Sequence, residues 1–217
     1  MGDGQLRCPA LGTPPTRGGA VLSHLRRAAK PRPQRDRVRL RRGRGRRHPI
    51  LRHKAGRRSI MQTFLPYADF ARSASVLDSS RLGNQRNEGL IVLKTLLGAY
   101  PKTKTGRPGG WPYHPATRMW RGYECALALY INEVCALIKD DTVAPQVQQI
   151  LEWYGPEDNG MPPWLGDRKF HRSHRAALVR KLPGHYRRHF PFVRSSHPYL
   201  WPHLDGKGGY VLKEKKG

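Results

Sequence analysis

The stretch from Arg81 to Leu97 constrains the fold more than any other part of this 217-residue chain. At about 100° per residue, its leucines gather on one side of a helix. Arg81, Gln85 and Glu88, spaced i, i+4 and i+7, form a line on the opposite side. The pattern predicts an amphipathic helix with one face in a core and the other available for chemistry.

Glu88 stands out because the chain as a whole is strongly basic. It contains 41 Lys and Arg residues against 15 Asp and Glu, a formal net charge of +26. Such an excess indicates a polyanionic partner, nucleic acid first and an anionic membrane surface second. A carboxylate placed among arginines therefore needs a reason. The alternative for this helix face is a solvated surface with an ordinary Arg–Glu pair.

The sequence gives little support for a membrane span or a metal site. The most apolar run, residues 89–100, contains a lysine and is too short to cross a bilayer. The three cysteines lack zinc-knuckle spacing, and His171 with His174, or His185 with His189, form helical pairs without a matching second pair. We therefore expect no metal, no cofactor and no membrane partner. No signal peptide is visible, which favours a cytoplasmic, nucleoid-associated protein.

Residues 1–60 differ in composition from the rest of the chain. They hold 18 Lys and Arg residues and 2 acidic ones, so they contribute +16 of the net charge of +26. With many prolines and little aliphatic periodicity, this extension is predicted to be disordered. It is either a phosphate-binding basic arm, translated sequence upstream of a true start at Met61, or an organellar presequence.

From Met61 the pattern predicts an all-α fold, a single compact helical domain over residues 61–204 with low sheet content. A loop is expected over residues 102–110, and a charged tail over residues 205–217. The aromatic, proline-rich residues 190–204 are expected to wrap the helices. The expected helices cover residues 69–77, 79–97, 115–139, 142–154 and 170–181.

Four segments carry a resemblance to a known family. They read MQTFLP (61–66), RLGxQRxE (81–88), HPAxxMWRGYE (114–124) and PWLGDxxFHxSHR (163–175). Together they resemble the pyrimidine-dimer DNA glycosylase family, closely in its bacterial branch and distantly in phage endonuclease V. The resemblance spans roughly residues 61–204 and does not include residues 1–60.

The resemblance implies a function and two catalytic groups. In that family the α-amine at the chain start attacks C1′ of a damaged nucleotide, and a glutamate on the first long helix assists; the matching residue here is Glu88. The nucleophile is then the amine of Met61, or of Thr63 after trimming, because Gln62 is too large for routine methionine removal. Arg81 lies where the phage enzyme has a histidine.

The expected activity is that of a DNA glycosylase with AP-lyase activity, acting through a Schiff base on a damaged or modified pyrimidine. An α-amine has a pKa of about 7.7–8.0 against about 10.4 for lysine, so near neutrality its reactive form is over a hundred-fold more populated. A peptide bond at Met61 would convert this amine to an amide. The working protein is therefore expected to start near Met61.

The expected partner is double-stranded DNA with a lesion or modified base, bound by a monomer. Trp164 either stacks on a base or belongs to the core, as a tryptophan between a proline and a leucine more often does. Two alternatives remain open: a non-catalytic nucleic-acid-binding protein and a metal-dependent nuclease. The candidate DNA-binding residues are Arg81, Gln85, Arg86, His114, Arg118, Arg121, His171, His174, Arg175 and Arg180, with Arg172 on the same face as the last four.

Overall fold

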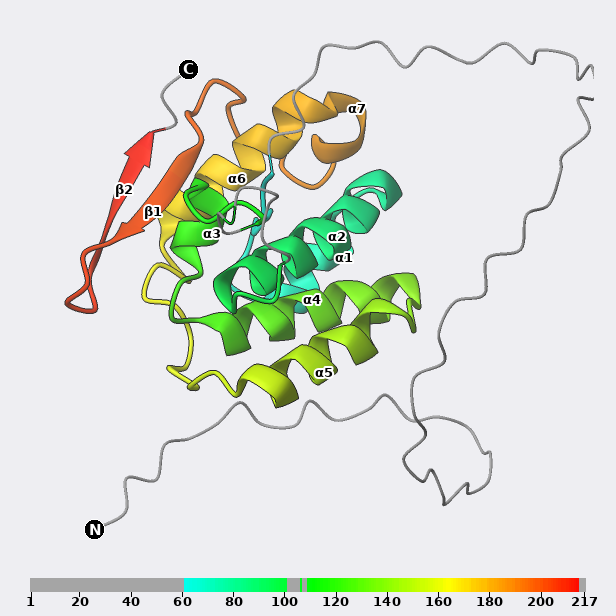
Figure 1. The fold of residues 1–217 in the computed structure, drawn as a ribbon. Coiled ribbons are helices and arrows are strands. Elements are labelled where there is room, and N and C mark those ends of the chain that lie inside the picture. The colour runs from blue at the N-terminus through cyan, green and yellow to red at the C-terminus, as the bar shows by residue number, and fades with distance from the viewer. Residues whose placement is uncertain (1–60, 101–105, 107–108, 215–217) are drawn as a thin grey trace, which may run out of the picture. The chain divides into compact units, whose positions relative to one another are not determined.

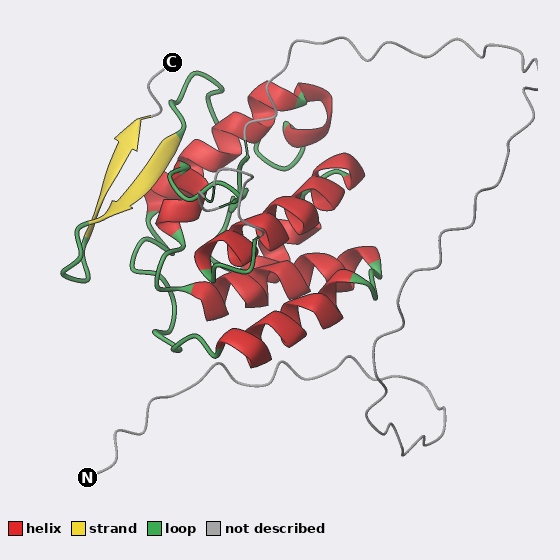
Figure 2. Cartoon of the chain, in the orientation of Figure 1, coloured by secondary structure: helices red, strands yellow, loops and turns green. Residues whose placement is uncertain are grey.

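The computed structural model describes residues 61–100, 106 and 109–214. The predicted extension and most of the predicted loop at 102–110 lie outside the described residues. Within the described part, seven helices and one two-stranded sheet are present (Figures 1 and 2), which confirms the mostly helical fold. No described helix combines the length and the apolar character that a membrane span requires.

Two short-range signals set the first helices. α1 (Phe70–Ser75) follows Asp69 and α2 (Ser79–Leu96) follows Asp78. Each aspartate accepts a hydrogen bond from the backbone N–H three residues further on, as an N-cap residue does. Both helices lie within or at the ranges predicted from the sequence, and α2 contains the line of polar residues that includes Glu88.

The single helix predicted over residues 115–139 is wrong. The structure has α3 (Pro115–Met119) and α4 (Glu124–Ile138), separated by a turn at Gly122. Gly122 has a φ of 81°, which a right-handed helix cannot contain. The turn lets Trp120 lie fully buried, because the chain changes direction immediately after it.

The second half of the described chain begins with α5 (Val143–Tyr154), as predicted, and α6 (Arg168–Lys181), which starts two residues before the predicted range. α7 (Pro183–Tyr186) is a single turn that begins at Pro183, a position where a helix tolerates proline. In Figure 1, α6 and α7 lie on one side of the molecule's helical part, and α4 with α5 on the other.

Residues 205–214 differ from the charged tail that was expected. β1 (Leu200–Leu204) and β2 (Tyr210–Glu214) pair antiparallel, with Leu200 opposite Glu214. Glycines in the connecting turn adopt positive φ. The hydroxyl of Tyr210 donates to Asp167 Oδ2 at 2.7 Å, so β2 is attached to the start of α6.

The core forms where α2 and α4 pack together. A Cβ atom on Gly89 would lie 2.7 Å from Ile131 Cγ1, so the two helices approach closely only because this position lacks a side chain. Trp164 is fully buried, with its indole N–H donating to Met119 O at 3.0 Å. Of the two predicted roles for Trp164, the structure supports the core role.

Residues 61–66, called segment 61–66 below, form no helix or strand, yet all six are buried. The segment runs between α2 and α6, as the cyan trace in Figure 1 shows. A buried chain without regular structure leaves its N–H and C=O groups to be satisfied by side chains. Those side chains define the candidate site.

Candidate active site

On the α2 side, the side-chain amide of Gln85 both accepts a hydrogen bond from the main chain of segment 61–66 and donates one to it. Its Oε1 accepts from Phe64 N at 2.6 Å, and its Nε2 donates to Gln62 O at 2.7 Å. The hydroxyl of Tyr130 donates to the same Oε1 at 2.8 Å. Because both ends of the amide are used, the position of the segment along α2 is fixed.

On the α6 side, two buried histidines bind the main chain of Leu65. His174 Nδ1 accepts from Leu65 N at 3.0 Å, and His171 Nδ1 lies 2.7 Å from Leu65 O. The second nitrogen of His171 accepts from Gly166 N at 2.9 Å, so His171 carries its proton on Nδ1. Burial lowers the pKa of both rings, that of His174 well below its usual value, so both are neutral.

Arg175 continues this contact by one residue. Its Nε donates to Pro66 O at 2.7 Å, and its guanidinium carbon lies 5.1 Å from the centre of the Tyr67 ring. The side chain is half-buried. Its charge is therefore used to hold the end of segment 61–66, in line with the two histidines before it.

Glu88 binds the other end of the segment. Gln62 N donates to Glu88 Oε2 at 2.8 Å, and the carboxyl group is half-buried. Burial raises the pKa of Glu88, while the bond from Gln62 N and the charge of Lys181 oppose that rise. A carboxyl group with a raised pKa at a partly open position is suited to proton transfer.

Met61 is the first described residue and is only 6% exposed. Of the two predicted catalytic positions, Glu88 binds the backbone nitrogen of Gln62, the residue that directly follows Met61.

Lys181 was missed by the sequence analysis: it is close enough to affect the Glu88 pKa, and its Nζ lies 5.7 Å from the Phe64 ring centre. No local pattern connects a residue at the end of α6 with one in the middle of α2.

Three of the candidate DNA-binding residues on α2 have other partners. Gln85 is 1% exposed because segment 61–66 covers it, so the face expected to be open is only partly so. Arg81 Nη1 lies 2.6 Å from Asp78 Oδ2. Arg86 forms an ion pair with Asp140, which explains why an arginine is found toward the packed side of the helix.

The candidates around α3 remain near the surface. His114 is the N-cap of α3, and its Nδ1 accepts from Ala116 N at 3.1 Å. Arg118 and Arg121 are exposed, and Arg121 Nη2 donates to Pro112 O at 3.4 Å. This pair of cations is available to phosphate groups.

The expected basic face on α6 is divided. His171 and His174 are buried, at 3% and 0% exposed, and so do not lie on a surface that DNA can reach. Arg172 and Arg180 are exposed. Among the residues described, no group of three or more His, Cys, Asp or Glu side chains is placed to hold a metal ion.

A comparison with known families adds an independent finding. Residues 61–139 match the model of a family described as pyrimidine dimer DNA glycosylase. The match confirms the resemblance noted in the sequence, without distinguishing the bacterial branch. It includes segment 61–66, Gln85 and Glu88, but ends before α6 and its histidines. Comparisons with curated proteins and with solved structures gave no match.

Proposed function

We propose that this protein is a DNA repair glycosylase with AP-lyase activity on damaged or modified pyrimidines of the pyrimidine-dimer type. The family match over residues 61–139 supports a DNA glycosylase. The observation that carries the mechanism is the 2.8 Å hydrogen bond from Gln62 N to Glu88 Oε2. A main-chain nitrogen at the beginning of the matched region is thus in contact with a half-buried carboxyl group.

The nucleophile in this proposal is a free α-amine. In a chain that starts at Met61, the amine lies one residue from the Glu88 contact, about 3.8 Å of backbone. In a chain that starts at Gln62, it is the nitrogen bonded to Glu88. A start at Thr63 would remove that nitrogen, so the geometry favours the first two. An amide cannot form an imine, and the proposal therefore requires a polypeptide without residues 1–60.

The reaction follows from these two groups. The neutral amine attacks C1′, and the glycosidic bond breaks with its electron pair leaving on the base, which takes up a proton. The sugar ring opens to a protonated Schiff base. The Glu88 carboxylate then removes a proton from C2′, and the C3′–O bond breaks to release the 3′ phosphate. Water hydrolyses the imine and restores the amine.

Borohydride trapping on DNA with an abasic site tests the proposal. Three proteins are compared: chains that start at Met61, chains that start at Gln62, and the full 217 residues. We expect a covalent adduct with at least one of the two shorter chains and none with the full chain. N-terminal acetylation of the active chain is the control and should abolish the adduct. An equal adduct with the full chain would contradict the proposed nucleophile.

A second candidate function is DNA binding without catalysis. The exposed pair Arg118 and Arg121 favours it, because phosphate contacts need no reactive amine. Such a protein would bind DNA with a strong salt dependence and form no borohydride adduct from any starting residue. In both cases we expect one protein molecule on each site in duplex DNA.

A further inference from the structure

The loop that follows α7, residues 187–196, carries a large aromatic side chain that the described residues do not cover. Phe192 is 94% exposed, more than any other large hydrophobic residue described. A single exposed apolar residue is common on protein surfaces. What separates Phe192 from such cases is its setting among cations and its fixed support.

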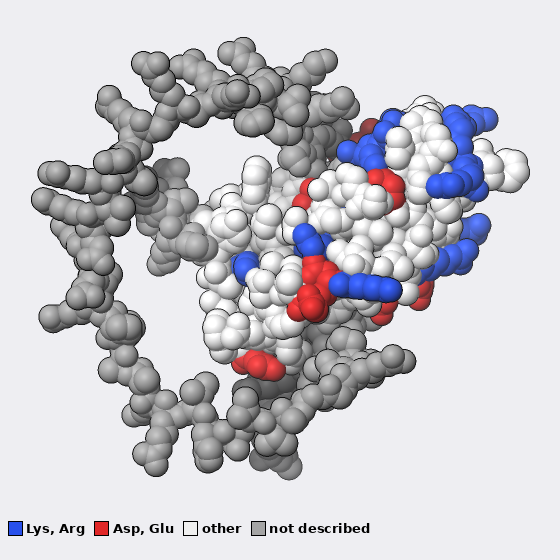
Figure 3. Space-filling model, turned by 90° about the vertical axis from the view of Figure 1, so that its right-hand side faces the viewer, with Lys and Arg blue, Asp and Glu red and all other residues white. Residues whose placement is uncertain are grey.

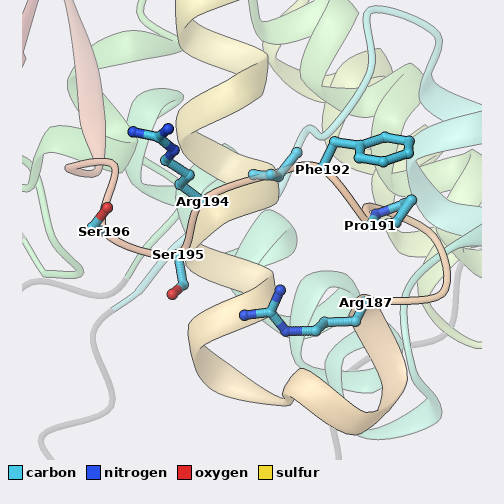
Figure 4. A pocket seen from close by; sticks show the side chains of 7 residues that line it. Arg187, Pro191, Phe192, Arg194, Ser195 and Ser196 are labelled. Carbon is cyan, nitrogen blue, oxygen red and sulfur yellow. The ribbon is translucent and has the colours of Figure 1, made fainter.

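The setting is a shallow hollow of about 350 Å³ lined by this loop. Its lining includes Arg187, Arg194, Ser195 and Phe192, and no acidic residue. In Figure 4, the guanidinium of Arg187 reaches toward Ser195, while the side chains of Arg194 and Phe192 extend in opposite directions along the loop. Guanidinium and hydroxyl groups are common ligands of DNA phosphates. Figure 3 shows Lys and Arg gathered at one edge of the face that it presents.

The loop is held from both ends. Arg180 of α6 donates hydrogen bonds to Ser195 O and His197 O. At the other end, the Phe190 ring is stacked on buried Tyr186, with ring centres 6.3 Å apart and planes at 2°. Because its base is fixed, the loop presents Phe192 without a large ordering cost on binding.

The same support connects the loop to the candidate active site. The hydroxyl of Tyr186 donates to Asp78 Oδ2 at 2.6 Å, and the Arg81 guanidinium carbon lies 5.4 Å from the Tyr186 ring centre. Glu88 is seven residues beyond Arg81 on α2, or about 10 Å along the helix axis.

We propose that loop 187–196 is a second DNA contact, in which Phe192 inserts between bases near the lesion. Arg187 and Arg194 hold the phosphates on either side of that step. The inference rests on the proposed function, since access to C1′ of a stacked nucleotide requires the duplex to be unstacked. An inserted ring replaces part of the stacking that is lost.

The test uses a duplex with a non-cleavable abasic analogue and 2-aminopurine placed one to three steps away. The affinity and the 2-aminopurine fluorescence are measured at several salt concentrations. With the unsubstituted protein, fluorescence should rise on binding because the reporter base loses a stacking neighbour. Phe192→Ala should abolish that rise and raise Kd about tenfold, with no change in the salt dependence.

Arg187→Gln and Arg194→Gln should give the complementary result. Each should lower the slope of log Kd against log salt by about 1, because one phosphate contact is lost, and each should keep the fluorescence rise. The matched control for the aromatic residue is Trp153→Ala on α5. Trp153 is 72% exposed and should affect neither measurement.

The proposed function and the proposed contact of Phe192 with DNA are overturned by different results. If the unsubstituted protein forms no borohydride adduct, the proposed function fails, and the fluorescence still reports whether Phe192 contacts DNA. If the adduct forms but Phe192→Ala binds and reports as the unsubstituted protein does, the inference is wrong. It is also wrong if Phe192→Ala converts a dimer to a monomer in sedimentation without changing DNA binding, since the loop would then join two copies.

Discussion

Gln85 and Glu88 lie one turn apart on α2 and both bind the main chain of segment 61–66, but their surroundings differ. Gln85 is 1% exposed and takes part in three hydrogen bonds, to Gln62, Phe64 and Tyr130. Glu88 is half-buried and accepts one backbone hydrogen bond, from Gln62 N. The amide of Gln85 is thus suited to fixing the position of the segment. The carboxyl group of Glu88 can still accept a proton or a further hydrogen bond.

This difference is what a site built on a main-chain amine would need. In the proposed reaction, the reactive nitrogen has no side chain of its own to position it, so neighbouring side chains must fix the segment that carries it. Gln85, His171 and His174 do so from two helices. The group that transfers protons must instead stay near the substrate, as the partly open position of Glu88 allows.

The largest expected effect comes from Glu88→Gln. The substitution keeps the shape and an acceptor for Gln62 N but removes the proton-accepting group. Strand cleavage at an abasic site should fall by about 10²–10⁴-fold, while borohydride trapping persists. The free energy of unfolding should change by less than about 1 kcal/mol, since the bond from Gln62 N is kept. Cleavage at the unsubstituted rate would remove Glu88 from its proposed role.

Gln85→Leu should show the opposite pattern, a large effect on stability. It leaves the N–H of Phe64, the C=O of Gln62 and the hydroxyl of Tyr130 without this partner in a buried region. At about 1–3 kcal/mol for an unsatisfied buried group, we expect a loss of roughly 3 kcal/mol in the free energy of unfolding, measured with denaturant. Exposed Asn84→Ala is the control. Equal stability of the two variants would show that Gln85 does not hold segment 61–66 in place.

The local features of the fold could be predicted from the sequence because short-range chemistry decides them. Asp69 and Asp78 cap two helices whose ranges were predicted, since a cap needs only the N–H groups of the next turn. The break at Gly122 was missed because Trp120, before it, is in helical spacing with Leu127 and Ile131, after it. There the burial of Trp120 outweighs the local pattern.

The candidate site was predicted in part. The helical line of Gln85 and Glu88 was visible, but which of the two would be covered depended on where segment 61–66 lies. His171 and His174 were predicted to face DNA because histidines beside arginines resemble a basic surface. Their actual partner, the main chain of Leu65, is more than a hundred residues away in the sequence, and no periodicity reports it.

His171 and His174 should make the free energy of unfolding depend on pH. Burial puts their folded-state pKa values below the usual 6.5, so below pH 6.5 the unfolded chain binds protons that the folded chain does not. Their contribution to stability is thus complete above pH 6.5 and decreases as the pH falls toward the folded-state values. We expect a loss of about 1 kcal/mol between pH 7.5 and 5.5, measured by denaturant unfolding.

The raised pKa of Glu88 acts in the opposite direction, because the folded chain then holds a proton that the unfolded chain releases above its usual value of 4.5. Repeating the pH series with Glu88→Gln removes this contribution and should make the loss on acidification larger. His174→Gln should reduce it. A stability that does not vary with pH in all three proteins would mean that the histidines are not held neutral by the fold.

The smallest effects are expected on the outer surface, at Arg118 and Arg121. Neither should influence segment 61–66, because both side chains are exposed and the side chain of Arg121 donates to Pro112 O instead. Arg118→Ala and Arg121→Ala should each weaken binding to damaged and undamaged DNA alike and lower the salt slope by about 1, measured by fluorescence anisotropy. The free energy of unfolding should stay within about 0.5 kcal/mol. A variant that loses its preference for damaged DNA would instead place that arginine at the damaged base. The buried residues that fix segment 61–66 and the exposed arginines would then not have separate roles in positioning and in phosphate binding.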